Sequence, residues 1–152
     1  MKDEIKHIQV DNHVLMQEIT RMFSTMGKES VTFIVRGYSM RPFLEDRRDK
    51  VVLGPPRTPK TGDVVLARIG KERYALHRVI RIENGTYTMQ GDGNPIHMTE
   101  KFTDTDIIGV ALAFIRKGKR VETTGLKWRT YSAIWRVLKP ARRIMLAIYR
   151  RI

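Results

Sequence analysis

A serine, a histidine and an aspartate follow one another in the chain in an order that suits acyl transfer. Ser39 lies in the segment Gly37-Tyr38-Ser39-Met40-Arg41-Pro42, directly after a short apolar run. A serine hydroxyl is a weak nucleophile at neutral pH and needs a base within hydrogen-bond reach. His77 is the best candidate for that base, because among the four histidines it alone lies inside a strong apolar run, residues 74–80, where a strand would fix its direction.

The third member of this set is an acidic residue for the second nitrogen of the imidazole. Such an acceptor fixes the tautomer of the base and stabilises the imidazolium that forms during attack. Asp92 is our first candidate, because it lies in a turn one predicted hairpin beyond His77. Taken alone, Asp92 also fits a plain turn residue that bonds its own backbone. Asp104 and Asp106 are the reserve candidates, since they precede a further strand of the same body.

Neither a metal nor another cofactor is expected. His77 and His97 have no close ligand spacing, the HExxH motif is absent, and the chain contains no cysteine. Paired-glycine nucleotide loops are also absent. The order Gly37 to Arg41 lacks the second glycine of the hydrolase nucleophile elbow, so that fold is not indicated.

The elements that would position these residues are short strands. Several runs rich in β-branched residues are separated by segments rich in Gly, Pro, Asn and Asp, and Asn84-Gly85 is a two-residue hairpin signal. The pattern predicts a mainly β fold, with a small and mostly antiparallel β body over residues 31–115. The runs are residues 31–35, 50–53, 63–69, 74–82, 86–90 and 107–115.

Helices are predicted on both sides of the β body. In the N-terminal segment, residues 1–30, apolar residues at three- and four-residue spacings predict one amphipathic helix over residues 9–27. We expect this helix to cover one edge or face of the body. Residues 116–152 form a predicted basic, amphipathic helical tail, which Pro140 kinks or divides.

Charge is concentrated in that tail. The 152-residue chain has a net charge of +13, of which residues 115–152 supply +11, with 12 Lys and Arg against one Glu. Apolar and aromatic residues on one side with arginine on the other are typical of an interfacial helix on an anionic bilayer. Packing against the body or a partner protein is an open alternative. No recognised nucleic-acid motif accompanies the charge, so no nucleic-acid partner is expected.

Length and composition predict one globular domain. No N-terminal signal peptide or membrane-spanning run is recognisable. We therefore expect a cytoplasmic protein, with peripheral membrane contact through residues 116–152 as a further option. The sequence does not indicate an oligomeric state.

Five ordered motifs over about residues 31–115 resemble the superfamily of signal peptidase I and LexA-like repressors, which are serine endopeptidases. The segment around Ser39 resembles its nucleophile box, and His77 stands where the general base is expected. The other matches are Thr61 to Val65, Gly91 to Asn94 and Asp106 to Val110. A histidine at position 77, in place of the lysine of bacterial signal peptidases and LexA-like repressors, is similar to the archaeal and endoplasmic-reticulum branch.

The resemblance implies a signal-peptidase/LexA-like β body and cleavage of a peptide or protein precursor. Ser39 would attack, His77 would act as base, Asp92 would orient His77, and the Ser39 N–H would donate to the oxyanion. The substrate would bind as an extended strand at the sheet edge, with small side chains near the cut. Gly37 offers no hydroxyl to the oxyanion hole. The alternative is a peptide-binding or scaffold protein of the same fold with weak or no catalysis.

Overall fold

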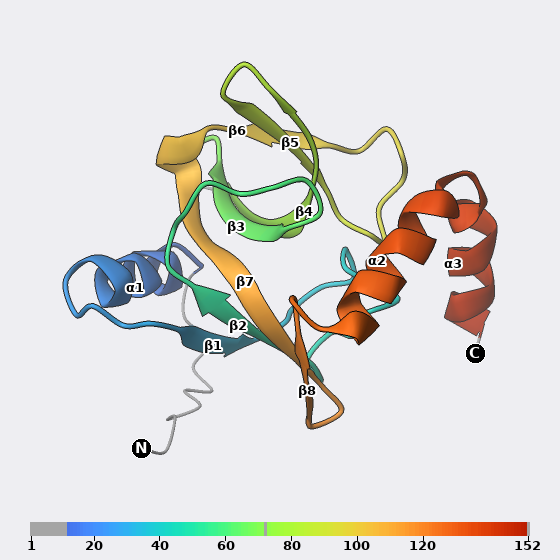
Figure 1. Cartoon of the computed structure of the whole chain (residues 1–152), viewed down its shortest axis with the longest axis horizontal. Helices are drawn as coiled ribbons and strands as arrows, with labels where there is room; N and C mark the ends of the chain where they lie inside the picture. Colours follow the sequence, from blue (N-terminus) through green and yellow to red (C-terminus); the bar gives the residue numbers. More distant parts are fainter. Residues whose placement is uncertain (1–11, 72, 152) are drawn as a thin grey trace.

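The computed structural model describes residues 12–71 and 73–151, which form one curled antiparallel sheet with helices at both ends of the chain (Figure 1). Neighbouring strands follow the order β1-β2-β7-β3-β4-β5-β6, and β8 pairs with β7. The prediction of a mainly β fold is confirmed.

The bounds of the elements are as follows. The strands are β1 (Val31–Ile34), β2 (Lys50–Gly54), β3 (Val64–Ile69), β4 (Arg73–Glu83), β5 (Thr86–Gln90), β6 (Glu100–Phe102), β7 (Ile107–Arg116) and β8 (Lys119–Glu122). The helices are α1 (Asn12–Ser24), α2 (Leu126–Val137) and α3 (Arg142–Arg151), with short 3-10 turns η1 (Asp104–Asp106) and η2 (Lys139–Ala141).

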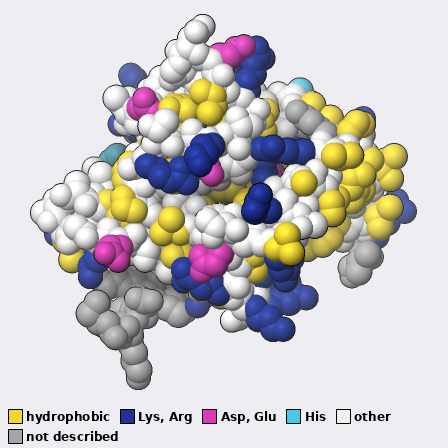
Figure 2. All heavy atoms as spheres, viewed as in Figure 1, with side chains coloured by type: hydrophobic (Ala, Val, Ile, Leu, Met, Phe, Trp, Pro, Cys, Tyr) yellow, Lys and Arg dark blue, Asp and Glu magenta, His cyan; other side chains and the backbone are white. Residues whose placement is uncertain are grey.

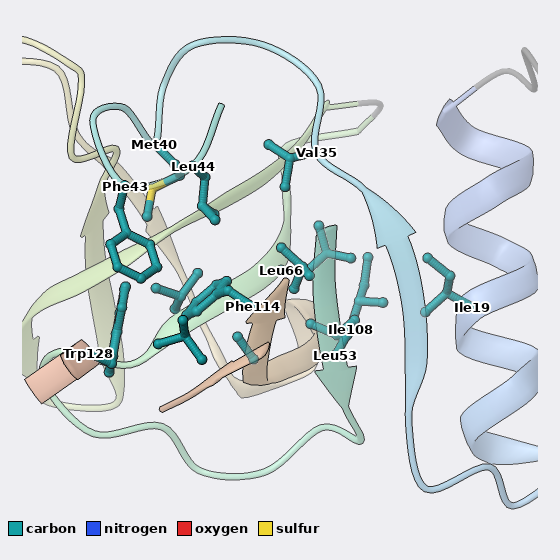
Figure 3. Packing of buried hydrophobic residues seen from close by; sticks show 14 of the residues in the cluster. Ile19, Val35, Met40, Phe43, Leu44, Leu53, Leu66, Ile108, Phe114 and Trp128 are labelled. Carbon is teal, nitrogen blue, oxygen red and sulfur yellow. The ribbon is translucent and has the colours of Figure 1, made fainter. Parts of the chain in front are cut away.

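The sheet separates two apolar clusters, and alternate residues of a central strand belong to different clusters. On β3, Val64 packs in the first cluster and Val65 in the second. This follows from the two-residue period of a strand, which sends successive side chains to opposite faces. The first cluster extends from Ile19 of α1 through Phe114 of β7 to Trp128 of α2 (Figure 3). On β3 the position of a residue along the strand therefore decides which cluster it joins, whereas on β7, opposite two register irregularities, the alternation is not kept.

The six predicted runs all form strands, and the Asn84-Gly85 turn joins β4 to β5 with both residues at positive φ. That conformation suits the tight two-residue hairpin turn that the pair predicted. Two strands, β6 and β8, were not predicted. Both are short and carry charged residues, so their sequences lack the apolar run that marks a strand. Strand β8 extends the sheet into the segment assigned to the helical tail.

The three long helices lie where helices were expected. The part of the predicted residue 9–27 helix that the structure describes forms α1, and residues 9–11 lie outside the described part of the chain. The tail forms α2 and α3, which η2 separates at Pro140. No helix among the described residues is long and apolar enough to cross a bilayer.

Candidate active site

Ser39 lies on a loop that is held down on both sides. Strand β1 ends at Ile34, and the chain returns to the sheet at β2. Met40 and Leu44 are buried beneath the loop, and the Gly37 N–H donates a hydrogen bond of 2.7 Å to Asp46 Oδ1. Gly37 has a φ of +88°, which favours glycine. These contacts hold the loop in place, with Ser39 at a half-buried position.

The Ser39 loop contacts the 91–94 turn through its backbone. The Gly93 N–H donates to the Ser39 carbonyl oxygen at 2.7 Å. A Cβ built on Gly91 would overlap that same carbonyl and lie 3.0 Å from Ser39 Cβ. A side chain at position 91 would thus push the serine away, so the turn needs a glycine there. The Ser39 segment and the 91–94 turn, two of the motifs singled out in the sequence, are therefore in contact.

His77 projects from β4 and is paired with a carboxylate that the sequence did not suggest. Its Nδ1 lies 2.9 Å from Oε2 of Glu100, and the two residues are 6% and 8% exposed. A carboxylate accepts hydrogen bonds, so Nδ1 carries a hydrogen, and in the neutral imidazole the lone pair is then on Nε2. No described residue hydrogen-bonds Nε2. His77 therefore has one nitrogen fixed and one available, as a general base requires.

The Ser39 loop packs where the β4–β5 pairing ends. Arg78 of β4 pairs with Gln90, the last residue of β5, and His77 and Gly91 are the next residues of the two segments. Ser39 packs on the Gly91 position. No hydrogen bond joins the side chains of Ser39 and His77 in this structure, and in free enzymes such bonds often form only when substrate binds.

Asp92 does not accept a hydrogen bond from His77, in contrast to the prediction. Its two carboxylate oxygens accept from Nε and Nη2 of Arg78, each at 2.8 Å, and Tyr131 Oη donates to Oδ2 at 2.9 Å. Because His77 and Arg78 are consecutive on β4, their side chains leave the sheet on opposite faces. Asp92 lies on the Arg78 face, so it cannot orient His77 in this arrangement.

The Arg78–Asp92 pair is deeply buried, with both side chains 1% exposed. Burial by itself would lower the pKa of Arg78, but the hydrogen bonds and the charge of Asp92 outweigh it and raise that pKa. Arg78 also lies over the ring of Trp128, 4.6 Å from its centroid, and donates to Ser132 Oγ at 2.8 Å. This network ties helix α2 to the turn beside Ser39.

The reserve acids have other partners. Asp104 accepts a 2.7 Å hydrogen bond from the Tyr87 hydroxyl, and Asp106 accepts one of 2.9 Å from the Thr103 N–H at the start of η1. Neither is hydrogen-bonded to His77. The other histidines are also elsewhere: His13 of α1 contacts the Tyr74 hydroxyl at 2.8 Å, His97 is exposed, and His7 lies outside the described residues.

Glu100 was missed because its strand is only three residues long. Met89 of β5 pairs with Glu100 in register, and Val79 pairs with Met89, so these three side chains share one face of the sheet. His77 is two residues from Val79 and therefore lies on that face too. In the structure Glu100 and Phe102 are buried around an exposed Lys101, but the sequence Glu-Lys-Phe has a single apolar residue and so gives no strand signal.

The surroundings of Ser39 leave room for a substrate carbonyl. The Ser39 N–H has no acceptor among the described residues, so it is available to an oxyanion. An open hollow of about 370 Å³ lies against Ser39. Its lining includes Tyr38, Asn94 and Met98 from loops and Leu146 and Tyr149 of α3, but neither His77 nor Glu100.

Comparison with known proteins assigns the family. A search of curated proteins finds no match. The family model described as Peptidase S24-like matches residues 3–112, which include Ser39, His77 and Glu100. This match supports the LexA- and signal-peptidase-like superfamily and, at that coarse level, a serine peptidase-like hydrolase. Because the match spans well over half of the chain, the protein belongs to the Peptidase S24-like family.

Proposed function

We propose that the protein is a serine endopeptidase in which Ser39 is the nucleophile, His77 the general base and Glu100 the residue that orients His77. The observation that carries the proposal is the buried His77–Glu100 pair, one residue before Arg78, whose partner Gln90 precedes the Gly91 turn on which Ser39 packs. The pair occupies Nδ1 of His77 and leaves Nε2 without a hydrogen-bond partner among the described residues, so Nε2 is the nitrogen that would take the proton.

The reaction would be acyl transfer in two halves. Ser39 Oγ attacks the carbonyl carbon of a peptide bond while His77 Nε2 takes the hydroxyl proton. The oxyanion accepts a hydrogen bond from the Ser39 N–H, and His77 returns the proton to the nitrogen as the C–N bond breaks. Water, deprotonated by His77, then hydrolyses the acyl-enzyme and frees Ser39. Glu100 stabilises the imidazolium that His77 forms during acylation and again during deacylation.

Strand β1 offers a binding edge for an extended substrate. Among the described strands its hydrogen-bonded neighbour is β2, on one side, and its C-terminal end leads directly into the Ser39 loop. A peptide added alongside β1 would therefore run toward the nucleophile. The resemblance to the serine-histidine signal peptidases suggests a peptide or protein precursor with small side chains near the cut.

A second candidate is a peptide-binding protein of the same fold with weak or no catalysis. Two observations favour it: Gly37 supplies no hydroxyl to the oxyanion hole, and Ser39 and His77 are not hydrogen-bonded to each other. Such a protein would still bind an extended peptide at the sheet edge.

An activated-serine probe distinguishes the two candidates. A fluorophosphonate should label the wild-type chain, and labelling should be lost in Ser39→Ala and fall by a factor of about 10³ or more in His77→Ala. Ser30→Ala is the matched control, since Ser30 is an exposed serine beside β1, and it should label like the wild type. An unlabelled wild-type chain, or equal labelling of Ser39→Ala, would favour the peptide-binding protein.

A further inference from the structure

Helix α3 turns its apolar side outward. Ile144 and Ile148 are 67% and 57% exposed, while Arg142 on the inward side is 4% exposed. A surface helix of a globular protein ordinarily shows the reverse arrangement, with its apolar stripe against the core. Together with Ala147, the two isoleucines form a shallow apolar surface, flanked by Arg143 and Arg151.

Helix α2 also carries exposed apolar side chains. Leu126, Ile134 and Val137 are 80%, 51% and 78% exposed, and their spacing places them on one side of the helix. Figure 2 shows hydrophobic side chains gathered on the side of the molecule where α2 and α3 lie in Figure 1, with basic side chains at the border. We call these five residues, Leu126, Ile134, Val137, Ile144 and Ile148, the tail face.

The charge around the tail face has one sign. Residues 126–151 contain eight Lys and Arg and no Asp or Glu. No acidic residue of α2 or α3 is therefore available to neutralise these cations. This segment also lies beyond residues 3–112, so the family match says nothing about it.

We propose that the tail face docks onto the surface of an anionic lipid bilayer. A bilayer offers an apolar phase for the exposed aliphatic side chains and negative headgroups for the surrounding cations. Nucleic acid would satisfy the cations but leave the aliphatic side chains in water. A second copy of this chain would bring its own cations against these, which like-charge repulsion opposes.

Docking by the tail face would hold the Ser39 hollow close to the bilayer. Leu146 and Tyr149, on the inward side of α3, line that hollow together with Ser39. The two sides of one helix would thus contact lipid and substrate. The lipid contact itself does not depend on catalysis, so Ser39→Ala should bind vesicles like the wild type.

Vesicle co-sedimentation of the full chain tests the proposal. We expect binding to vesicles of phosphatidylcholine with 30% phosphatidylglycerol and little binding to pure phosphatidylcholine. The double change Ile144→Ser with Ile148→Ser should weaken binding by about tenfold or more, because it removes inserted methyl and methylene groups. Arg143→Gln with Arg151→Gln should weaken it by about tenfold, and raised salt should reduce wild-type binding in the same way.

A matched control uses exposed residues away from the tail. Ile82 is 41% exposed on β4, and Lys60 is exposed before β3, so Ile82→Ser with Lys60→Gln removes one isoleucine and one cation. This variant should bind vesicles like the wild type. The proposal is wrong if the wild type does not sediment with anionic vesicles, or if the Ile144 and Ile148 changes leave binding intact. Sedimentation velocity showing a dimer that these changes disrupt, without vesicle binding, would identify a second copy as the occupant instead.

Discussion

His77 and Arg78 are neighbours in the chain, yet each pairs with a carboxylate on a different face of the sheet. On one face His77 contacts Glu100, and on the other Arg78 contacts Asp92. The two pairs differ in what they leave open. His77 keeps one nitrogen without a partner among the described residues, whereas every oxygen of the Asp92 side chain is engaged.

The difference indicates a structural role for one pair and a chemical role for the other. The Arg78–Asp92 pair joins three parts of the molecule, because Tyr131 of α2 donates to the carboxylate and Trp135 Nε1 donates to the Asp92 carbonyl oxygen at 3.2 Å. It fixes the turn that supports Ser39 and anchors the tail. The His77–Glu100 pair instead resembles the base and orienting acid of a serine hydrolase. One strand thus carries a structural contact and, in the proposed function, a chemical one on consecutive residues.

The largest expected effect comes from breaking the structural pair. Arg78→Ala leaves the Asp92 carboxylate buried without its main partner, and losing one member of a buried pair typically costs about 3–5 kcal/mol. We expect a loss of that order in the free energy of unfolding, measured by urea denaturation with fluorescence of Trp128 and Trp135. Arg81→Ala, at an exposed position on the same strand, should change stability by less than about 0.5 kcal/mol.

A control within the same pair separates the charge from the packing. Arg78→Met with Asp92→Leu removes both charges and retains apolar volume, and should cost less than Arg78→Ala alone. Equal costs for the two variants would mean that the unpaired carboxylate is not the source of the effect.

The next largest effect should be on chemistry, at Glu100. Glu100→Gln keeps the size of the side chain but removes the charge that stabilises the imidazolium of His77. We expect the second-order rate constant for fluorophosphonate labelling of Ser39 to fall about 100-fold, with little change in the urea midpoint. Asp92→Asn should do the opposite, lowering stability more than it lowers the labelling rate of the remaining folded protein. A Glu100→Gln variant that labels at the wild-type rate would remove Glu100 from the site.

Tyr131 tests how the tail is held to the Asp92 turn. Tyr131→Phe removes one hydrogen bond to a charged acceptor, so we expect a loss of about 1–2 kcal/mol in unfolding free energy at pH 7. Burial, together with the charge of Asp92, raises the pKa of Tyr131 above its ordinary value of 10. The folded state then holds this proton more tightly than the unfolded chain does.

That pKa shift gives Tyr131 a pH signature. The stabilisation is fully present below pH 10 and is lost as pH rises above it, by about 1.4 kcal/mol per pH unit from this residue. Unfolding free energies of Tyr131→Phe measured between pH 9 and 11 should therefore fall less steeply than those of the wild type. Parallel curves for the two proteins would show that Tyr131 ionises as freely in the folded state as in the unfolded chain.

Sequence patterns predicted the strands and helices of this fold well, because apolar periodicity reports burial directly. The sequence patterns did not predict which carboxylate contacts His77. Choosing between Asp92 and Glu100 requires knowing which face of β4 each one meets, and that depends on the register of β5 and of the short strand β6. A pairing between strands is a long-range property that no local run of residues encodes.

The smallest expected effect is that of changing Asp104, a reserve candidate for the acid that pairs with His77. Asp104 bonds the Tyr87 hydroxyl and is not hydrogen-bonded to His77, so Asp104→Asn should leave the labelling rate of Ser39 within about twofold of the wild type. Its cost should be confined to about 0.5–1.5 kcal/mol of unfolding free energy, because one side-chain hydrogen bond is weakened.

The comparison with Glu100→Gln is informative because both variants exchange one carboxylate for an amide in neighbouring elements. If Asp104→Asn instead slowed labelling as much as Glu100→Gln, Glu100 would act on Ser39 and His77 only through its contribution to the negative charge of this region. The hydrogen bond from His77 to Glu100 would then have no special part in orienting the base.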